Sequence, residues 1–382
     1  MRKLVLLLLI GITVISCNSQ TKSEKKHQVN IKKSALQKES LKIKNDSIYF
    51  SIKSNADSLF LYTSTFGYEK VEKENEYFTK KYQQDSLDYS HFTYGFYQFK
   101  NGIQSNAGNG IHRGKYFPKA PKHVKELKGD ISTIPINSKY LKEERNIFIY
   151  KPIGFDKNKV YNLLFILDAN KSVVKYHSSL IEHLVNTKKI KDLIIVGIPN
   201  REIKKNKKYS EEIDFRALEF LEDYSKLNHS TTHHGHSEIP SELINRHTDF
   251  INFLEKEVYN YIISNINITN DYYKKCIYGT SNGGDFVVSL SRKKPSLFGS
   301  NIAFSFGWHY NVKEPIWSDP KSPNFYLAVG KYEKEFVEVV KNWKSILETQ
   351  GSQYKFSEEL SGHDNAMWNL MFVKYIEEIF NK

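Results

Sequence analysis

Residues 277–284 read Ile277-Tyr278-Gly279-Thr280-Ser281-Asn282-Gly283-Gly284 and contain the pattern G-x-S-x-G. Apolar runs flank the pattern, one ending at Tyr278 and the other beginning at Phe286. This context predicts a strand, a sharp turn and a helix, which is the arrangement of a nucleophile elbow. The glycines of the pattern leave room for the strand and the helix to approach each other. We therefore predict that Ser281 is a nucleophile with an exposed hydroxyl group.

A histidine that could act as the base follows the elbow along the chain. Only His309 and His363 come after Ser281. Folds with this elbow present the serine first, then an acid, then the histidine. His363 lies in Ser361-Gly362-His363-Asp364, between an expected strand and the expected last helix. A solvent-exposed turn is the simpler interpretation of a lone Gly-His pair, but the elbow upstream favours catalysis, and we predict that His363 is the general base.

The acid that orients this histidine is expected after residues 325–330, Phe-Tyr-Leu-Ala-Val-Gly, which predict a buried strand followed by a helix. Glu333 comes first in the connecting loop and is the preferred candidate. Glu335 is an alternative, although its position at the helix start suits an acidic residue that favours the helix dipole. Asp319, in a proline-flanked loop before the strand, is a third candidate. Asp364 is expected to cap the last helix.

The N-terminus has the features of a targeting segment. A charged start, Met1-Arg2-Lys3, precedes an apolar run over residues 4–14 that is too short to span a bilayer. Val14-Ile15-Ser16-Cys17 then resembles a bacterial lipobox, which implies cleavage before Cys17 and lipidation of that cysteine. The alternative is an ordinary secretory signal with an incidental cysteine. We expect a protein of the bacterial cell envelope, on the outer-membrane or periplasmic side, held to the membrane by its lipid anchor only.

Composition limits the class of partner. The chain has 382 residues, 40% of them hydrophobic, and a formal net charge of +13. The charge indicates a lysine-rich surface, or else attraction to acidic surfaces, anionic glycans or an anionic substrate. The sequence contains no nucleic-acid module and no glycine-rich phosphate loop, so we expect no nucleic acid partner. No cofactor or metal is required by the chemistry of a serine, a histidine and an acid.

The pattern of the chain changes along its length. Residues 46–52, 57–63 and 92–99 are short β-rich segments that suggest a small β-sandwich. Charged residues from Glu69 to Asp85 suggest a loop or an edge between them. The expected organisation is a signal peptide with lipobox at 1–17, a polar tether at 18–44, a β-rich domain at 45–115, a linker at 116–140 and an α/β domain at 141–382.

The C-terminal part predicts an α/β domain. Continuous apolar runs at 146–150, 162–167 and 193–198 are expected of strands covered on both faces. Residues 242–264 carry apolar side chains at helical spacing. Because such strands alternate with helices, we predict a mostly parallel central sheet.

One histidine-rich segment interrupts this pattern within residues 201–240, an expected insertion near the carboxyl edge of the sheet. Its four imidazoles could bind a metal such as zinc. Clustered histidines on a surface loop are common and no neighbouring motif supports a metal, so none is predicted. The histidines are His229, His233, His234 and His236.

Residues 140–382 together resemble the "Putative esterase" family of α/β-hydrolases, which includes enterochelin esterases, feruloyl and acetyl-xylan esterases and mycolyl transferases. The resemblance implies Ser281 as nucleophile, His363 as base and Glu333 as acid, and it implies that residues 45–115 form the immunoglobulin-like module of the enterochelin-esterase branch. The pieces that carry it are residues 163–168, Val196-Gly197-Ile198-Pro199-Asn200, the elbow, Pro295-Ser296-Leu297-Phe298, Gly330-x-x-Glu333 and Gly362-His363-Asp364 with Trp368.

The leading functional interpretation is a carboxylic-ester hydrolase that acts on a siderophore-type ester or a glycan acyl ester. Backbone N–H groups of Asn282 and near Ala169 would bind the oxyanion, although Asp168-Ala169-Asn170 stands where family members commonly have Asp-Gly. Trp308 could form a wall of the substrate site. The alternative is a non-catalytic envelope lipoprotein that binds a glycan or a protein through a hydrolase-like fold.

Overall fold

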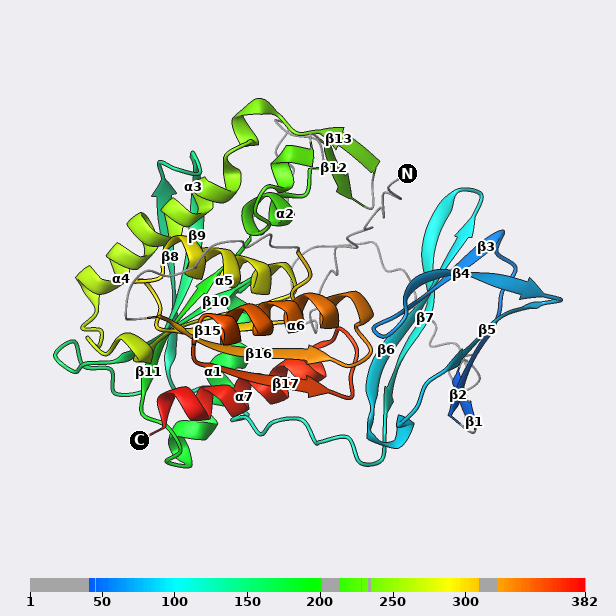
Figure 1. Ribbon diagram of the computed structural model, residues 1–382, viewed down its shortest axis with the longest axis horizontal. Coiled ribbons are helices and arrows are strands. Elements are labelled where there is room, and N and C mark those ends of the chain that lie inside the picture. The colour runs from blue at the N-terminus through cyan, green and yellow to red at the C-terminus, as the bar shows by residue number, and fades with distance from the viewer. Residues whose placement is uncertain are drawn as a thin grey trace, which may run out of the picture. The chain divides into compact units, whose positions relative to one another are not determined.

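The computed structural model describes residues 41–44, 46–200, 213–227, 229–232, 235–308 and 322–381. The chain divides into two compact units (Figure 1). Residues up to Phe117 form most of the first unit, and residues from Pro118 form most of the second. No helix in the described parts of the chain is long and apolar enough to cross a membrane.

The first unit is one antiparallel sheet with the strand order β1-β2-β5-β4-β3-β6-β7. Phe50 on β2 contacts Phe92 and Phe96 on β6, with ring centroids 6.5 and 6.2 Å apart, although three strands separate β2 from β6 in this order. The sheet therefore folds over an apolar core. Its strands are β1 (Leu41–Lys44), β2 (Ser47–Lys53), β3 (Ser58–Thr63), β4 (Gly67–Glu74), β5 (Tyr77–Gln83), β6 (His91–Lys100) and β7 (Ile103–Arg113).

The charged stretch from Glu69 to Asp85 does not form the loop or edge that we expected. It contributes β4 and β5, which lie in the interior of the strand order. Val71, Phe78 and Tyr82 face the core, while most of their neighbours are charged and face solvent. A strand with so few apolar residues has a weak alternating pattern, and its pairing with neighbouring strands stabilises it instead.

The second unit is built on an eight-stranded sheet with the order β17-β16-β15-β14-β10-β11-β9-β8. Strands from β17 to β11 pair in parallel, and β9 pairs antiparallel with both β11 and β8. The strands are β8 (Asp130–Ser138), β9 (Glu143–Lys151), β10 (Asn162–Leu167), β11 (Leu193–Ile198), β14 (Lys275–Thr280), β15 (Ser300–Phe304), β16 (Asn324–Gly330) and β17 (Tyr354–Glu359).

Strand β8 lies inside the stretch 116–140, which we expected to be only a connection. It is an edge strand of the sheet, paired with β9 alone. Pro135 sits within it. Proline has no N–H to donate to a neighbouring strand, but it is tolerated in edge strands. Its presence therefore favoured a connecting segment over a strand in the prediction from sequence.

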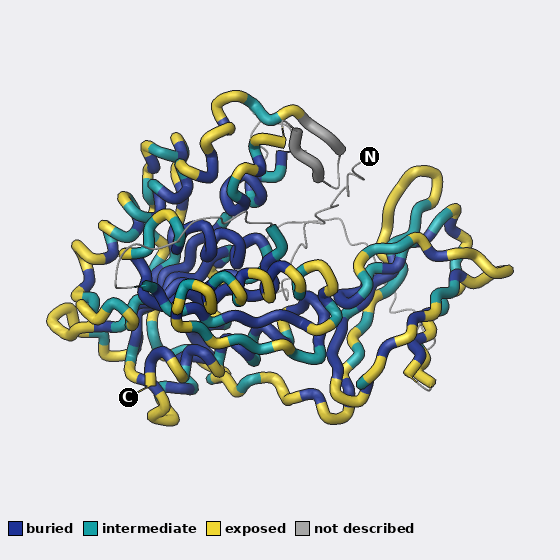
Figure 2. Tube along the Cα trace, in the orientation of Figure 1, coloured by how far each residue is buried: buried dark blue, intermediate teal, exposed yellow. Residues whose placement is uncertain are grey.

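Helices cover both faces of this sheet (Figure 1), and the strands between them are buried (Figure 2). One face carries α1 (Lys171–Asn186) and α7 (Asn365–Phe380), whose apolar residues share a core with β10 and β11. The other core includes residues of α3 (Arg246–Asn252), a π-helical segment (Phe253–Tyr259), α4 (Asn260–Asn265), α5 (Asn282–Lys293) and α6 (Lys334–Thr349). The helix expected at 242–264 thus begins as a short 3₁₀ turn and continues through a π-helical middle.

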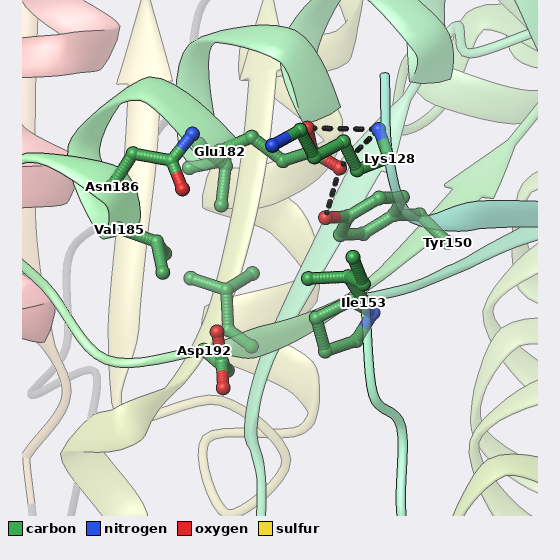
Figure 3. Close-up of a pocket in the computed structure, with 10 residues that line it drawn as sticks. Lys128, Tyr150, Ile153, Glu182, Val185, Asn186 and Asp192 are labelled. Carbon is green, nitrogen blue, oxygen red and sulfur yellow. Dashed lines mark hydrogen bonds between the residues drawn. The ribbon is translucent and has the colours of Figure 1, made fainter.

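A small pocket lies at the amino ends of the parallel strands, whereas the elbow lies at their carboxyl ends (Figure 3). It is lined by Leu193, the first residue of β11, whereas Ser281 follows the last residue of the parallel strand β14. The Glu182 carboxylate accepts hydrogen bonds there from the Lys128 N–H and the Tyr150 hydroxyl, both at 3.0 Å. Because this carboxylate is satisfied by the protein itself, the pocket is part of the packing between α1 and the sheet.

Candidate active site

Ser281 occupies a sharp turn between β14 and α5, with φ 54° and ψ −131°. Its N–H donates to the Phe304 carbonyl oxygen at 2.9 Å, which ties the turn to the neighbouring strand β15. A side chain would not fit at Gly279, because its Cβ would lie 2.2 Å from the Gly283 carbonyl oxygen. Backbone conformations of this kind are sparsely populated and are held in place by the surrounding structure, as at the nucleophile of an elbow.

The structure brings Glu333 and His363 together. Glu333 follows β16 and precedes α6, and His363 lies between β17 and α7. His363 Nδ1 lies 2.6 Å from Glu333 Oε2, and both side chains are buried. The His363 ring also contacts Phe336 and Trp368, with centroids 4.5 and 4.9 Å away. These contacts leave the imidazole little rotational freedom and direct Nδ1 at the carboxylate.

The second carboxylate oxygen of Glu333 is also satisfied. Oε1 accepts hydrogen bonds from the Ser305 hydroxyl at 2.8 Å and from the Gly330 N–H at 2.6 Å. The Trp368 Nε1–H in turn donates to Ser305 Oγ at 2.8 Å. No motif in the sequence points to Ser305, although it directly follows a strand at the carboxyl edge of the sheet, as Ser281 does.

The other acidic candidates lie elsewhere. Glu335 is in the first turn of α6, and Asp364 is the N-cap of α7, accepting the Ala366 N–H at 2.9 Å. Asp319 falls outside the described residues. Of the acidic side chains that the structure describes, Glu333 is the one bonded to His363.

The two backbone N–H groups that we expect to bind the oxyanion differ in whether they already have a hydrogen-bond partner. Asn282 is the first residue of α5, where backbone N–H groups have no partner within the helix. The Ala169 N–H donates instead to the Ile198 carbonyl oxygen at 3.1 Å. That bond takes up the donor, so Ala169 is not available for the role that the sequence suggested. The reason is the packing of the loop after β10 against the end of β11.

Trp308 is held in place at the end of β15. Its N–H donates to Asp285 Oδ1 at 2.8 Å and its Nε1–H to the Glu222 carbonyl oxygen at 2.7 Å. The ring lies 6.1 Å from that of Tyr224. Trp308 is half-buried.

An ion pair that the sequence did not suggest lies beside the elbow. Arg216 on α2 (Phe215–Phe220) donates from Nε to Asp168 Oδ1 at 2.9 Å and from Nη2 to Asp168 Oδ2 at 2.8 Å. Burial alone would lower the pKa of Arg216, but the charge and hydrogen bonds of Asp168, together with the charges of Asp214 and Asp285, outweigh it and the pKa is raised. Asp168 follows β10 with φ 53°. Three adjacent strands, β10, β14 and β15, are thus each followed directly by a polar residue of positive φ, namely Asp168, Ser281 and Ser305.

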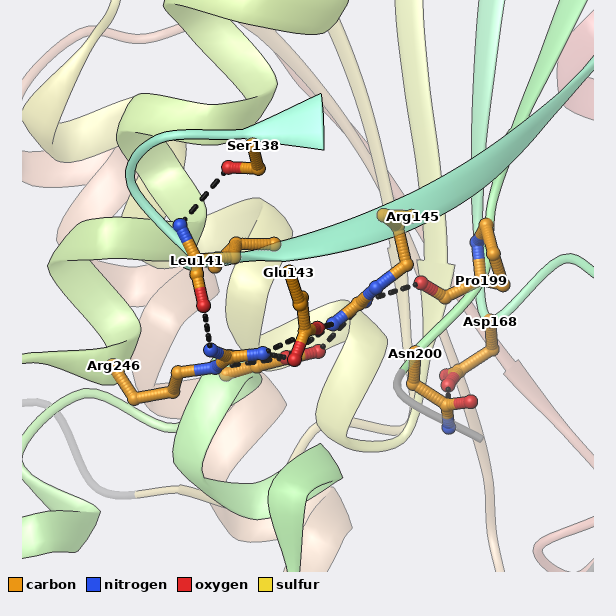
Figure 4. Close-up of polar contacts among 9 residues, drawn as sticks. Ser138, Leu141, Glu143, Arg145, Asp168, Pro199, Asn200 and Arg246 are labelled. Atoms are coloured by element: carbon orange, nitrogen blue, oxygen red, sulfur yellow. Dashed lines mark hydrogen bonds and ion pairs between the residues drawn. The ribbon is translucent and has the colours of Figure 1, made fainter. Parts of the chain in front are cut away.

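A buried ionic network fixes α2 to the rest of the unit (Figure 4). The Glu219 carboxylate accepts hydrogen bonds from Arg145 Nη2 at 2.8 Å and from Arg246 Nη2 at 2.6 Å. Arg145 also donates to the Pro199 carbonyl oxygen, and Arg246 donates to that of Leu141. The network joins β9, α2, α3 and the end of β11, and so it sets the position of Arg216 near the elbow.

The predicted lipidation site and the histidine-rich segment fall largely outside the described part of the chain. Cys17 is not among the described residues, nor are His233 and His234, and the side chains of His229 and His236 are likewise not described. Among the residues that the structure does describe, no group of histidine, cysteine, aspartate or glutamate side chains is placed to hold a metal ion.

Comparisons with known proteins agree with this architecture. Among solved structures, the chain is similar to the enterochelin esterase of Shigella flexneri, with a TM-score of 0.62, 12% identity, and coverage of 90% of this chain and 96% of that one. The ferric enterobactin esterase of Salmonella typhimurium gives a TM-score of 0.60 at 11% identity, covering 87% and 93%. The ferulic acid esterase of Anaeromyces mucronatus, solved with ferulic acid, gives 0.52 at 16%, covering 68% and 94%.

Comparison at the level of sequence adds the family. A search among curated proteins finds no significant match. The family described as "Putative esterase" matches residues 138–379, which is more than half of the chain. This range contains the elbow, the Glu333–His363 pair and the eight-stranded sheet of the second unit, apart from most of β8. The chain therefore belongs to the "Putative esterase" family and is an esterase with a fold of the α/β-hydrolase type.

Proposed function

We propose that the chain hydrolyses carboxylic esters with a triad of Ser281, His363 and Glu333. The observation that carries the proposal is the 2.6 Å contact between His363 Nδ1 and Glu333 Oε2 in the loops that follow β16 and β17. The elbow conformation of Ser281, at the same edge of the sheet, supports the role of nucleophile.

In this mechanism the Ser281 hydroxyl attacks the ester carbonyl while His363 accepts its proton at Nε2. His363 then returns the proton to the leaving alcohol, and a water molecule repeats the sequence on the acyl-enzyme. Glu333 holds the Nδ1–H tautomer and stabilises the imidazolium that forms. The Asn282 N–H, at the start of α5, stabilises the oxyanion together with the positive end of the helix dipole.

The substrate that we propose is a small-molecule or glycan ester, either a siderophore-type ester or an acyl ester of a glycan. Two kinds of structural neighbour support these alternatives, the enterobactin esterases and the ferulic acid esterase. The half-buried Trp308 would offer a flat surface for an aromatic or sugar group. The family match does not favour the alternative of a non-catalytic binding protein.

We also propose that the first unit is an immunoglobulin-like module and that Cys17 carries a lipid anchor at the bacterial cell envelope. The folded-over antiparallel sheet of the first unit is compatible with such a module. The lipobox-like stretch Val14-Ile15-Ser16-Cys17, followed by a polar tract, supports the anchor. One lipid chain binds weakly, so stable attachment requires more than one.

A fluorophosphonate probe tests the proposed nucleophile, because such probes label an activated serine covalently. We expect labelling of the wild-type protein at Ser281, and at least a ~10³-fold loss of p-nitrophenyl acetate hydrolysis in Ser281→Ala. Turnover within a few-fold of wild type in that variant would refute the proposal. The acid is tested by Glu333→Gln against Glu335→Gln, and a larger loss from Glu335→Gln would reassign it.

A further inference from the structure

The Glu333 carboxylate is bound on two sides, and only one of them belongs to the proposed triad. Oε2 faces His363, while Oε1 accepts the Ser305 hydroxyl at 2.8 Å. Ser305 Oγ accepts the Trp368 Nε1–H at 2.8 Å, so its own hydrogen is free to point at Glu333. The result is a one-way chain of donors from Trp368 through Ser305 to the carboxylate.

Ser305 is held where this contact requires it. It is fully buried, it follows β15 with φ 49°, and its N–H donates to the Ala328 carbonyl oxygen of β16 at 2.9 Å. A positive φ is unfavourable for a residue with a Cβ and persists only when the surroundings impose it. This strained position places the hydroxyl against the acid.

A carboxylate can rotate about its last side-chain bond, which changes the direction in which its two equivalent oxygens point. Two donors on one oxygen, the Ser305 hydroxyl and the Gly330 N–H, fix this rotation and leave the other oxygen directed at His363. Hydrogen bonds to a charged acceptor in a buried site are stronger than those between neutral groups. Oε2 is then left for His363 alone.

We propose that Ser305 and Trp368 are positioning residues for ester hydrolysis, acting through Glu333. Trp368 has two parts in this arrangement, since its Nε1–H orients Ser305 and its ring packs against the His363 imidazole, with centroids 4.9 Å apart at 85°. The inference rests on the proposed triad, because Ser305 and Trp368 act by holding Glu333 and His363 in place.

The test uses variants of the full chain that remove one donor at a time. Ser305→Ala removes the hydroxyl, and Ser305→Gly removes it while fitting the positive φ, so the second variant retains the fold even if the first does not. Trp368→Phe removes the Nε1–H and keeps a ring beside His363. Ser300→Ala is the matched control, because Ser300 is an equally buried serine on β15 whose hydroxyl donates to the Tyr273 carbonyl oxygen.

We expect kcat for p-nitrophenyl acetate to fall about 10- to 100-fold in both Ser305 variants and less in Trp368→Phe, with KM nearly unchanged, as for a small misplacement of a catalytic group. The control should retain wild-type kcat. In a Glu333→Gln background, removal of the Ser305 hydroxyl should cause almost no further loss, because its effect passes through that carboxylate.

Three results would overturn the inference. Wild-type kcat in Ser305→Gly would show that the hydroxyl has no role. An equal fold-loss in the presence and absence of Glu333→Gln would show a role independent of the acid, and the triad itself would stand. Unchanged kcat in Glu333→Gln alone would refute the acid of the proposed triad, and the inference would fall with it.

Discussion

Replacing Glu219 by Gln should destabilise the second unit severely. Glu219 is 0% exposed, and the two guanidinium groups that share it belong to Arg145 and Arg246, whose side chains are 6% and 4% exposed. Removal of one partner from a buried ion pair costs about 3–5 kcal/mol, because the remaining charges stay buried without compensation. Among the described residues, Glu143, itself partly exposed, is the remaining carboxylate that forms an ion pair with both arginines. Burial would raise the pKa of Glu219, but the two arginines outweigh burial and the pKa is lowered. The folded protein therefore stabilises the charged carboxylate, which Glu219→Gln removes.

Urea or thermal unfolding followed by circular dichroism measures the effect. A loss of this size corresponds to a fall in Tm of about 10 °C for a unit of this length. Glu76→Gln is the control, because the Lys53–Glu76 pair has side chains that are 54% and 70% exposed, and its Tm should equal that of wild type. A change below about 1 kcal/mol in Glu219→Gln would refute the reasoning, and would mean that Glu143 and the backbone carbonyls suffice for both arginines.

Two further predictions concern pH and processing. Burial lowers the pKa of His177 and of His247 to about 4, so between pH 6.5 and 4 the unfolded chain binds protons that the folded chain does not, and the free energy of unfolding should fall by up to about 3 kcal/mol for each residue. The fall in Tm from pH 7 to pH 4.5 should be smaller in His177→Gln than in wild type, and equal falls would contradict this. Cys17→Ala should leave the protein unprocessed or release it into the soluble fraction, whereas wild-type protein that is fully soluble, with a mature N-terminus other than residue 17, would argue against the anchor.

The α/β-hydrolase type of fold could be predicted because its strands are continuous apolar runs and its elbow is a local pattern. Ser281 directly follows β14 and Glu333 lies in the short loop between β16 and α6, and these positions can be read from the sequence alone. Strands with mixed composition could not be recognised in this way. Strand β8 contains a proline, and β4 has only Val71 in the core, so pairing with neighbours rather than composition defines both.

The supporting residues of the site were harder to predict. Arg216 meets Asp168 from 48 positions away, and Trp368 meets Ser305 from 63 positions away. Such contacts depend on the register of the sheet and on the exact placement of short helices. A short pattern cannot encode them, and the same holds for Ala169, whose N–H donates to the Ile198 carbonyl oxygen at the end of the next strand, β11. Residues near the ends of apolar strands could therefore be predicted more readily than the distant side chains that contact them.

The positive-φ residues that follow β10, β14 and β15 imply a trade-off between thermal stability and activity in this enzyme. Asp168, Ser281 and Ser305 all adopt backbone conformations that glycine would adopt at lower energy. A directed-evolution screen that rewards only a high melting temperature should thus accumulate glycine at Ser281, whereas glycine at Asp168 or Ser305 would also remove the partner of Arg216 or of Glu333. The gain in stability at Ser281 would remove the proposed nucleophile, so variants from that screen would be robust proteins with little esterase activity.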